Sequence, residues 1–249
     1  MEIRNINFKN QNKNIVGDLY LPDNLKDKDT YPVLILSHGF SGDRHHVHGY
    51  ITKMIHAGYA VYAFDFCGDG YGSESDGKTT EMSVLTEKKD LEVVLEGIRK
   101  QPFCQKVVLW GKSQGGFVSA IVASDHVDEV DALVLYYPAF VLQDDAKNAY
   151  PNIDDIPETY SIMNMEIGKI YNEDARSFDV YDVIGNYNKN VLLIHGTEDS
   201  IVPIEYAEKA VDQYENVKYI VIEGATHGFD DEYEDMAIQE TKEFLDEVL

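Results

Sequence analysis

A serine flanked by glycines stands where an apolar run gives way to a more polar, helix-like stretch. Residues 107–117 read Val-Val-Leu-Trp-Gly-Lys-Ser-Gln-Gly-Gly-Phe, a buried strand followed by a Gly-X-Ser-X-Gly turn centred on Ser113. A sharp strand-to-helix turn of this kind exposes the serine Oγ above the edge of a sheet, where it can act as a nucleophile. Gly111 and Gly115 suit such a turn because it leaves no room for side chains beside the serine.

A serine hydroxyl needs a base, and the base needs an acid that orients it. Enzymes that use this turn carry the acid, and then the histidine, later in the chain. An apolar strand beginning at 190 leads to Asp199, and another beginning at 218 leads to His227. Both residues follow the carboxyl ends of strands, where open α/β sheets place their sites. Glu198 is the alternative acid to Asp199. The order of these residues predicts nucleophilic catalysis by Ser113, Asp199 and His227.

An oxyanion hole is the third requirement for acyl transfer. One donor is the backbone N–H of the residue after the nucleophile, here Gln114, and the other comes from the loop after an earlier strand. The strand that begins at Tyr31 opens into His38-Gly39-Phe40, and we assign the second donor to Phe40. Each such donor stabilises the transition state by roughly 3 kcal/mol.

Other chemistries fit these residues less well. Gly111-Lys112-Ser113 ends like a phosphate-binding loop, but that motif needs a glycine five residues before Gly111, where the chain has Lys106. The purely structural alternatives are a helix-capping role for Ser113 and a solvated surface position for His227. The ordered set of nucleophile, acid and histidine favours catalysis over both.

Three further clusters are not expected to form sites. The histidines within 45–48 lack a carboxylate or cysteine at ligand spacing, so we expect them to open a helix. The glycine-rich run 67–77 follows a strand but meets no helix, unlike a dinucleotide fingerprint, and is expected at the rim of the site. Cys67 and Cys104 have no metal or redox spacing and are expected to be reduced thiols. We expect no metal and no organic cofactor.

The composition limits the partners. The 249 residues include 45 acidic against 21 basic side chains, a formal net charge of −24, which argues against nucleic acid and anionic membranes as partners. The start Met-Glu-Ile-Arg-Asn lacks the features of a signal peptide, and no apolar run approaches the roughly 20 residues that span a bilayer. A cytoplasmic protein acting on a small molecule is expected. The oligomeric state stays open, a homodimer included.

Apolar runs and amphipathic stretches alternate, which is typical of a mostly parallel sheet covered by helices. We therefore expect a single α/β domain over residues 1–249, with helices on both faces of the sheet. An antiparallel hairpin of strands 2–9 and 14–21 should come first. The remaining strands are predicted at 33–37, 60–66, 107–110, 132–136, 191–195 and 219–222, and helices at 49–57, 81–100, after Ser113 and at 235–248.

The stretch at about 139–189 breaks this alternation. It holds some fifty residues where the bare fold needs one helix, and it mixes aromatic with acidic side chains. Long insertions in compact domains usually carry function, so we expect a small helical cap that gives the site an apolar wall. The alternative is a surface excursion whose aromatic side chains pack on the sheet.

Motifs of one enzyme group are spread over most of the chain. These residues resemble the α/β-hydrolase superfamily, and more narrowly the small bacterial cinnamoyl (feruloyl) esterases. The triad motifs are shared by many hydrolases and specify the superfamily more than the substrate. The motifs are His38-Gly-Phe-Ser-Gly42, Phe64-Asp-Phe66 with Ser75-Asp-Gly-Lys78, Gly111-Lys-Ser-Gln-Gly-Gly116, His195-Gly-Thr-Glu-Asp199 and Gly224-Ala-Thr-His227.

The resemblance also implies substrate-binding residues in the cap. In those esterases an aspartate soon after a Pro-Ala pair, and a later tyrosine, bind the phenolic end of the hydroxycinnamoyl group. Asp145 and Tyr171 match these positions, and their structural alternatives are helix capping and packing. The chain departs from the family at Lys112 and at Asp69, where histidines are usual, and its loop 67–77 is longer.

The sequence thus predicts a serine carboxylesterase that cleaves hydroxycinnamate esters through an acyl-enzyme. A short-chain acyl esterase or a hydrolase similar to monoacylglycerol lipase is the alternative within the fold, and a peptidase also fits it. From another class, a non-catalytic protein that binds aromatic ligands would show a broken triad, whereas this one is intact in sequence.

Overall fold

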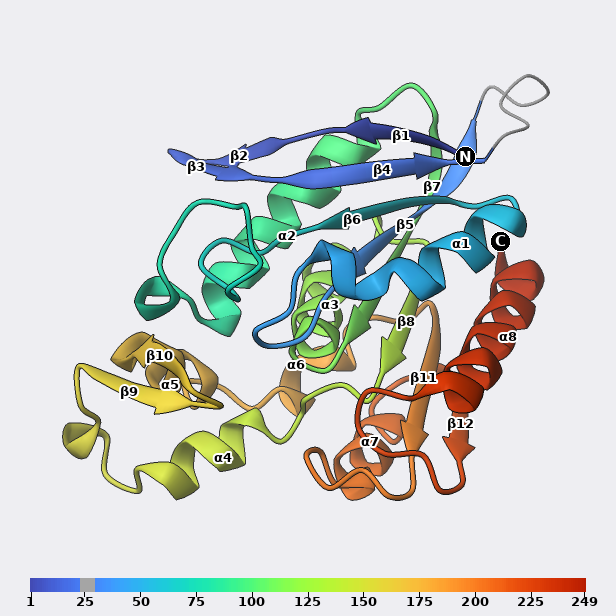
Figure 1. Ribbon diagram of the computed structural model, residues 1–249. Helices are drawn as coiled ribbons and strands as arrows, with labels where there is room; N and C mark the ends of the chain where they lie inside the picture. The colour runs from blue at the N-terminus through green and yellow to red at the C-terminus, as the bar shows by residue number, and fades with distance from the viewer. Residues whose placement is uncertain (23–29) are drawn as a thin grey trace.

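The computed structural model describes residues 1–22 and 30–249, and its centre is an eight-stranded sheet (Figure 1). The apolar runs form its inner strands because both faces of the sheet are covered. In spatial order the strands are β1 (Glu2–Asn5), β4 (Gly17–Leu21), β6 (Ala60–Phe64), β5 (Tyr31–Ser37), β7 (Cys104–Lys112), β8 (Ala132–Tyr136), β11 (Asn190–Gly196) and β12 (Asn216–Ile222).

The strands from β6 to β12 are parallel, whereas β4 pairs antiparallel with both β6 and β1. The predicted N-terminal hairpin is therefore antiparallel, but its tip is a separate ladder of β2 (Phe8–Asn10) and β3 (Lys13–Ile15). The division falls at Asn7, whose side-chain oxygen accepts the backbone N–H of Gly17 at 3.2 Å. The Asn7 side chain thus takes the backbone N–H of Gly17, which a continuous ladder of strand hydrogen bonds would use.

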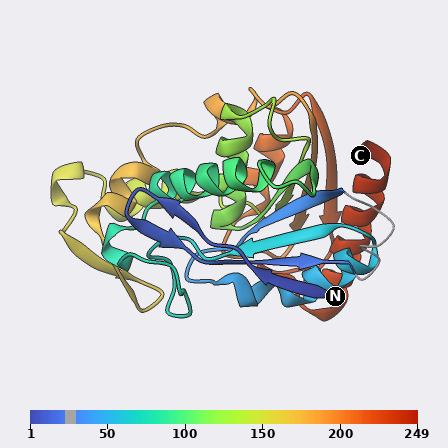
Figure 2. The ribbon, with the colours of Figure 1, turned by 90° about the horizontal axis from the view of Figure 1, so that it is seen from above.

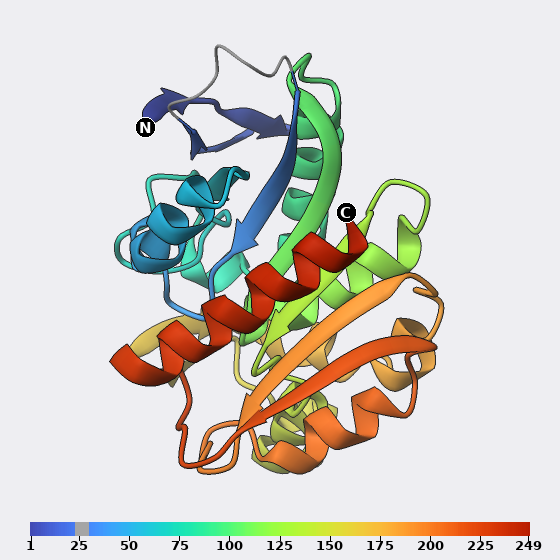
Figure 3. The same cartoon turned by 90° about the vertical axis from the view of Figure 1, so that its right-hand side faces the viewer.

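Helices cover both faces of the sheet, as the sequence predicts. Helices α1 (His48–His56) and α8 (Asp231–Val248) pack on one face, where α8 runs across the strands (Figure 3). The other face is covered by α2 (Val84–Arg99), α3 (Gln114–Asp125), α6 (Tyr181–Ile184) and α7 (Ile204–Val211). None of the helices in the described ranges combines the length and apolar character needed to cross a bilayer.

The stretch 139–189 projects beyond the carboxyl ends of the parallel strands, to one side of the sheet (Figures 1 and 2). It contains helices, as expected, but also an antiparallel hairpin that the sequence did not reveal. Its elements before α6 are α4 (Leu142–Ala149), the 3₁₀ turn η3 (Ile153–Asp155), β9 (Thr159–Ile162), β10 (Met165–Gly168) and α5 (Lys169–Ala175).

Two short 3₁₀ helices introduce longer ones. The turn η1 (Arg44–Val47) leads directly into α1, so the histidine-containing run 45–48 opens a helix as predicted. The turn η2 (Thr79–Glu81) precedes α2, whose first turn is capped by Ser83. Both turns follow loops at the carboxyl edge of the sheet, next to the predicted site.

Candidate active site

Ser113 sits in a strained turn between β7 and α3. Its backbone has φ 50° and ψ −120°, a combination that a residue other than glycine rarely adopts and that the surroundings must enforce. They do so through its backbone, because the N–H of Ser113 donates to Tyr136 and its carbonyl accepts from Phe117 and Ala139. A Cβ at Gly111 would lie 2.2 Å from the carbonyl oxygen of Gly115, so the turn closes only with glycine there.

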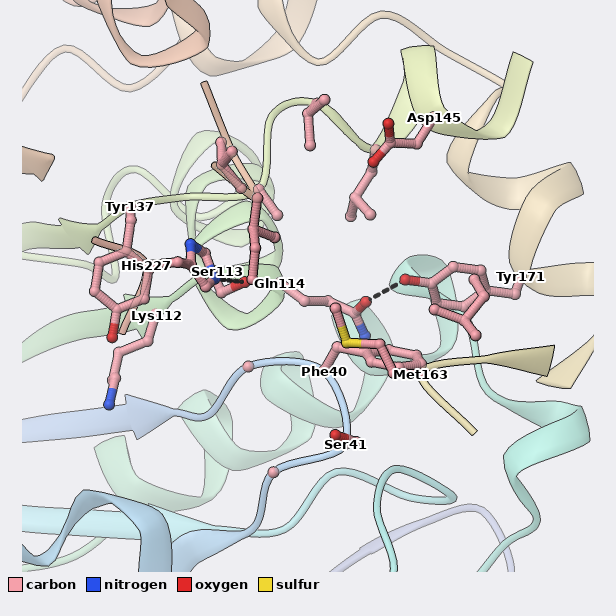
Figure 4. Close-up of a pocket in the computed structure, with 18 of the residues that line it drawn as sticks. Phe40, Ser41, Lys112, Ser113, Gln114, Tyr137, Asp145, Met163, Tyr171 and His227 are labelled. Atoms are coloured by element: carbon pink, nitrogen blue, oxygen red, sulfur yellow. Dashed lines mark hydrogen bonds between the residues drawn. The ribbon is translucent and has the colours of Figure 1, made fainter. Parts of the chain in front are cut away.

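The structure brings the three predicted catalytic side chains together. Ser113 Oγ lies 3.0 Å from His227 Nε2 (Figure 4), and His227 Nδ1 lies 2.8 Å from Asp199 Oδ2. Asp199 follows β11 and His227 follows β12, so adjacent parallel strands deliver the two side chains to one edge. The rival carboxylate, Glu198, is exposed. The arrangement can pass a proton from the serine to the imidazole.

Asp199 is held as an anion. Partial burial opposes its ionisation, but hydrogen bonds with His195 and His227 and from the backbone N–H of Val202 outweigh burial and lower its pKa below the ordinary value. Its Oδ1 accepts the N–H groups of Ile201 and Val202 at 3.0 and 2.8 Å. The carboxylate therefore fixes its own loop with one oxygen and the His227 ring with the other.

Tyr137 supports the histidine, a contact that sequence reasoning missed. Its ring lies edge-on to His227 with the centroids 4.6 Å apart, and its backbone has a φ of 37°. A positive φ is costly for a bulky residue and indicates a position that the surrounding structure enforces. The only sign in the sequence is its place directly after a buried strand, next to Pro138.

The turn after β5 packs directly against the nucleophile. A Cβ at Gly39 would lie 3.1 Å from Ser113 Cβ, and a hydrogen bond of 3.0 Å from Gly42 N–H to Gly39 O closes the turn. Phe40 and Gln114, the predicted oxyanion donors, both line the cavity beside Ser113. The structure thus places both donor-bearing residues on the cavity that Ser113 also lines.

Ser113 and His227 open into a cavity of about 650 Å³, within the range typical of sites for small organic molecules. The wall formed mainly by the stretch 139–189 is largely apolar. Its apolar side chains are Phe40, Ala139, Val141, Leu142, Ala146, Ala149, Ile162, Met163, Ile201 and Val202. An uncharged acyl group is the natural occupant of such a wall.

Asp145 and Tyr171 both line this cavity, but their environments differ. In Figure 4 they lie across Ser113 from Tyr137 and Lys112. Desolvation, together with the neighbouring Asp144, raises the pKa of Asp145, whose side chain is still exposed. Tyr171 is buried, and its hydroxyl donates to Gln114 Oε1 at 2.6 Å. Tyr171 therefore has only an oxygen lone pair to offer a ligand.

Lys112 lies on the opposite side of Ser113. Its ammonium group lies 4.3 Å from the centre of the Tyr50 ring. Burial lowers the pKa of Lys112 to about 8, although the carboxylate of Glu234 acts in the other direction. The ammonium group of the residue that precedes Ser113 therefore loses its proton more readily than that of an ordinary lysine.

The residues of the loop 67–77 are not among those that line the cavity, but the hydroxyl of Tyr71 donates to the carbonyl of Asn164 at 3.0 Å, next to the cavity-lining Met163. The loop lies behind the turn 38–42, where Asp69 Oδ1 accepts the N–H of Ser41 at 2.9 Å. A Cβ at Gly70 would lie 2.5 Å from the carbonyl of Gly42. A glycine at position 70 therefore permits the close approach of the two backbones.

Comparisons with known proteins show the family of the chain. The family model described as serine aminopeptidase, S33 matches residues 28–172, and one described as TAP-like protein matches residues 173–248. Protein bem46 of Schizosaccharomyces pombe is 26% identical over 206 residues, which cover 82% of this chain and 62% of that protein. A monoacylglycerol lipase of Mycolicibacterium smegmatis is 32% identical over 127 residues, 50% of this chain and 42% of that enzyme.

Among solved structures, Est1E from Butyrivibrio proteoclasticus with bound ferulic acid superimposes with a TM-score of 0.89, at 25% identity and with 98% of each chain covered. Family and fold together support an esterase-like or lipase-like hydrolase. The chain belongs to the α/β-hydrolase superfamily, in the family described as serine aminopeptidase, S33.

Proposed function

We propose that this protein is a serine carboxylesterase that hydrolyses hydroxycinnamate esters. The observation that carries the proposal is the hydrogen-bonded series from Ser113 Oγ through His227 to Asp199, at the base of a cavity with an apolar wall. The fold match to Est1E, a protein solved with ferulic acid, supports the aromatic acyl group.

In the proposed reaction, Ser113 Oγ attacks the ester carbonyl while His227 Nε2 takes its proton. The tetrahedral intermediate collapses as His227 returns that proton to the leaving alcohol, which leaves the acyl group on Ser113. Water then attacks the acyl-enzyme, with His227 as base, and releases the acid. Asp199 keeps Nδ1 of His227 protonated and stabilises the imidazolium.

The N–H groups of Phe40 and Gln114 are proposed to bind the oxyanion. Both residues border Ser113 in the cavity, and Gln114 is the first residue of α3, where backbone N–H groups have no partner within the helix. The positive end of the helix dipole favours the negative charge that develops on the carbonyl oxygen. Each donor should contribute roughly 3 kcal/mol in the transition state.

The acyl group is proposed to lie along the apolar wall, with its phenolic hydroxyl between Asp145 and Tyr171. A carboxylate accepts a phenolic O–H, and a buried hydroxyl without a partner costs about 1–3 kcal/mol. The hydroxyl of Tyr171 is already donated to Gln114, so Asp145 would be the acceptor that gains most from a phenol. Selectivity for phenolic over plain acyl esters therefore depends chiefly on Asp145.

A monoacylglycerol or short-chain ester is the second candidate substrate. The observation that favours it is the partly exposed apolar mouth, where Met163 and Ile201 border the cavity at 65% and 48% exposure. A lipase-like enzyme would gain rate with acyl length and would show no preference for an aromatic acyl group.

Steady-state hydrolysis of methyl ferulate and of p-nitrophenyl butyrate tests these proposals. We expect a higher kcat/KM for methyl ferulate, no activity in Ser113→Ala, and a tenfold or larger selective loss on methyl ferulate in Asp145→Ala, since one such contact is worth about 1.4 kcal/mol or more. Asp144→Ala, next to Asp145 but bonded to Tyr206, is the matched control.

Each outcome has a distinct meaning. Activity that persists in Ser113→Ala contradicts the mechanism. A preference for butyrate that Asp145→Ala leaves unchanged contradicts the hydroxycinnamate assignment and leaves the triad in place.

A further inference from the structure

Two acidic side chains meet in the interior behind the oxyanion turn, although the proposed mechanism uses neither. Asp69 comes from the loop 67–77 and Glu87 from the first turn of α2, and both are 0% exposed. Their carboxyl groups are in hydrogen-bonding contact. Two ionised carboxylates at such a distance repel each other strongly, so a buried pair of this kind retains a proton.

The remaining contacts leave one oxygen of each carboxyl group for that proton. Asp69 Oδ1 accepts the N–H of Ser41, and Glu87 Oε1 accepts from the side-chain amide of Gln114 at 2.8 Å. In the described part of the chain, Asp69 Oδ2 and Glu87 Oε2 are buried without any other hydrogen-bond donor. One proton held between these two oxygens would satisfy both.

Among the described residues that act on the pair, none supplies a cation that could replace the proton. His38 Nδ1 is 3.7 Å from Asp69 Oδ2, but the backbone N–H of Phe66 donates to its Nε2 at 3.1 Å. That nitrogen therefore holds a lone pair, and the ring is neutral, with Nδ1 placed to donate to the carbonyl of Gly39 at 2.9 Å. Asp90 of α2 and Tyr171 of α5 also act on the pair, and neither of them is a cation.

The pair joins the two halves of the proposed oxyanion hole. On one side Asp69 holds the N–H of Ser41, the residue after Phe40. On the other side Glu87 holds the side chain of Gln114, whose amide oxygen also accepts the hydroxyl of Tyr171. The turn after β5 and the first residue of α3 are thus connected by a continuous series of hydrogen bonds through the interior.

We propose that Asp69 and Glu87 share one proton and that this acid pair positions the two backbone donors of the oxyanion hole, an inference that rests on the proposed esterase function. Loss of the proton would leave two adjacent buried anions, which would push the loop and α2 apart. It would also place a second negative charge behind the site where the oxyanion forms. Both effects act on the transition state and lower kcat rather than raise KM.

Burial makes it harder to remove the shared proton, because it disfavours the ionised form of both carboxyl groups. It raises the pKa of Asp69, and it raises that of Glu87 well above the ordinary value, to which the charge of Asp69 adds. The shared proton should therefore persist well above the pH at which an ordinary carboxyl group ionises.

The test compares pH profiles of kcat and KM for the wild type, Glu87→Gln, Glu87→Met and Glu96→Gln. A glutamine at 87 keeps the acceptor for Gln114 and supplies a permanent donor to Asp69. We expect the wild type to lose kcat in alkaline solution at nearly constant KM, and Glu87→Gln to keep its neutral kcat without that loss. Glu87→Met should lose about 100-fold in kcat at every pH, the order expected for a misplaced catalytic group.

Glu96→Gln is the matched control, because Glu96 lies on the same helix but is exposed and bonded only to Lys100 among the contacts described. It should follow the wild-type profile. An alkaline loss that keeps its midpoint in Glu87→Gln overturns the proposal and assigns the loss to another group, of which Lys112, with its lowered pKa, is one candidate.

Infrared spectroscopy is a second test of the shared proton. It does not depend on catalytic turnover or on the folding of Glu87→Met. The wild type at neutral pH should show the carbonyl stretch of a protonated carboxylic acid, and this band should disappear in Glu87→Gln. An unchanged band contradicts the shared proton. Failure of the proposed function is recognised separately, as hydrolysis that survives in Ser113→Ala. If hydrolysis needs Ser113 but Glu87→Gln matches the wild type, only the acid pair is refuted.

Discussion

The two oxygens of Asp199 have separate tasks, and a single substitution can separate them. Oδ1 accepts two backbone N–H groups of its own loop, whereas Oδ2 accepts from His227. Because the pKa of Asp199 is lowered, the stability that its ionised form contributes is present above the ordinary carboxyl pKa. That stability is lost as the pH falls through the lowered value of the folded state.

Asp199→Asn should preserve the conformation of the loop after β11 but abolish most of the catalytic activity. Asparagine retains Oδ1 as an acceptor for the loop. Its amide nitrogen, which replaces Oδ2, can only donate and cannot accept from His227 Nδ1, so the imidazole adopts the wrong tautomer. We expect kcat to fall about 10⁴-fold, with near-normal thermal stability at neutral pH by circular dichroism. Glu198→Gln, the exposed neighbour, should be fully active. The reverse pattern would identify Glu198 as the catalytic acid.

At the scale of single elements, the start of α2 shows how the sheet and the stretch 139–189 are tied together. Ser83 Oγ accepts the N–H of Thr86, Thr86 Oγ1 accepts the N–H of Ser83, and the two form a capping box. The same Ser83 hydroxyl donates to Asp174 of α5. This buried serine therefore stabilises α2 and anchors the helix that carries Tyr171.

Ser83→Ala should lower the free energy of unfolding by about 1–2 kcal/mol, the upper part of the range for lost N-caps, because the bond to Asp174 is lost as well. Urea unfolding followed by circular dichroism measures it. Ser119→Ala is the control: Ser119 is equally buried, and its hydroxyl has no hydrogen-bond partner within the described ranges. Equal effects of the two substitutions would show that burial, and not capping, sets the cost.

The sequence was sufficient for the elements with a strong periodic signal. The inner strands and the helices at 49–57 and 81–100 were predicted to within a few residues, because long apolar runs and helical spacing are local properties. Helix α7 and the hairpin of β9 and β10 were missed. Both are short, and the hairpin turns through Met163 and Asn164 at positive φ without a glycine to mark it.

The same distinction applies to the site. Ser113, Asp199 and His227 could be placed together because each follows a strand, and parallel strands end at one edge. The contact of Asp69 with Glu87 could not be predicted, because it depends on how the loop 67–77 folds back against α2. The bond from Tyr171 to Gln114 likewise depends on the path of the whole stretch between them.

At the scale of the molecule, repulsion between the excess acidic side chains is the dominant long-range interaction. The chain has 45 acidic and 21 basic residues, so the net effect of its long-range charge interactions is repulsive. Exposed ion pairs contribute at most about 1 kcal/mol each. Sodium chloride should therefore raise the melting temperature, by about 2–4 °C for each kcal/mol of repulsion that it screens. Near the isoelectric point of about 4.5 the effect should vanish. A melting temperature that falls with salt would show that ion pairs dominate.

The division of the cavity between separate parts of the chain has an evolutionary consequence. Ser113, Asp199 and His227 come from loops at the sheet edge, whereas the acyl wall is drawn largely from one continuous stretch, 139–172. Mutations or exchanges in that stretch can change which esters are accepted while the reacting groups are inherited intact. Tyr171 is an exception, because its bond to Gln114 ties it to the nucleophile turn. Descendants of such a chain would be expected to diversify around that tyrosine and retain it.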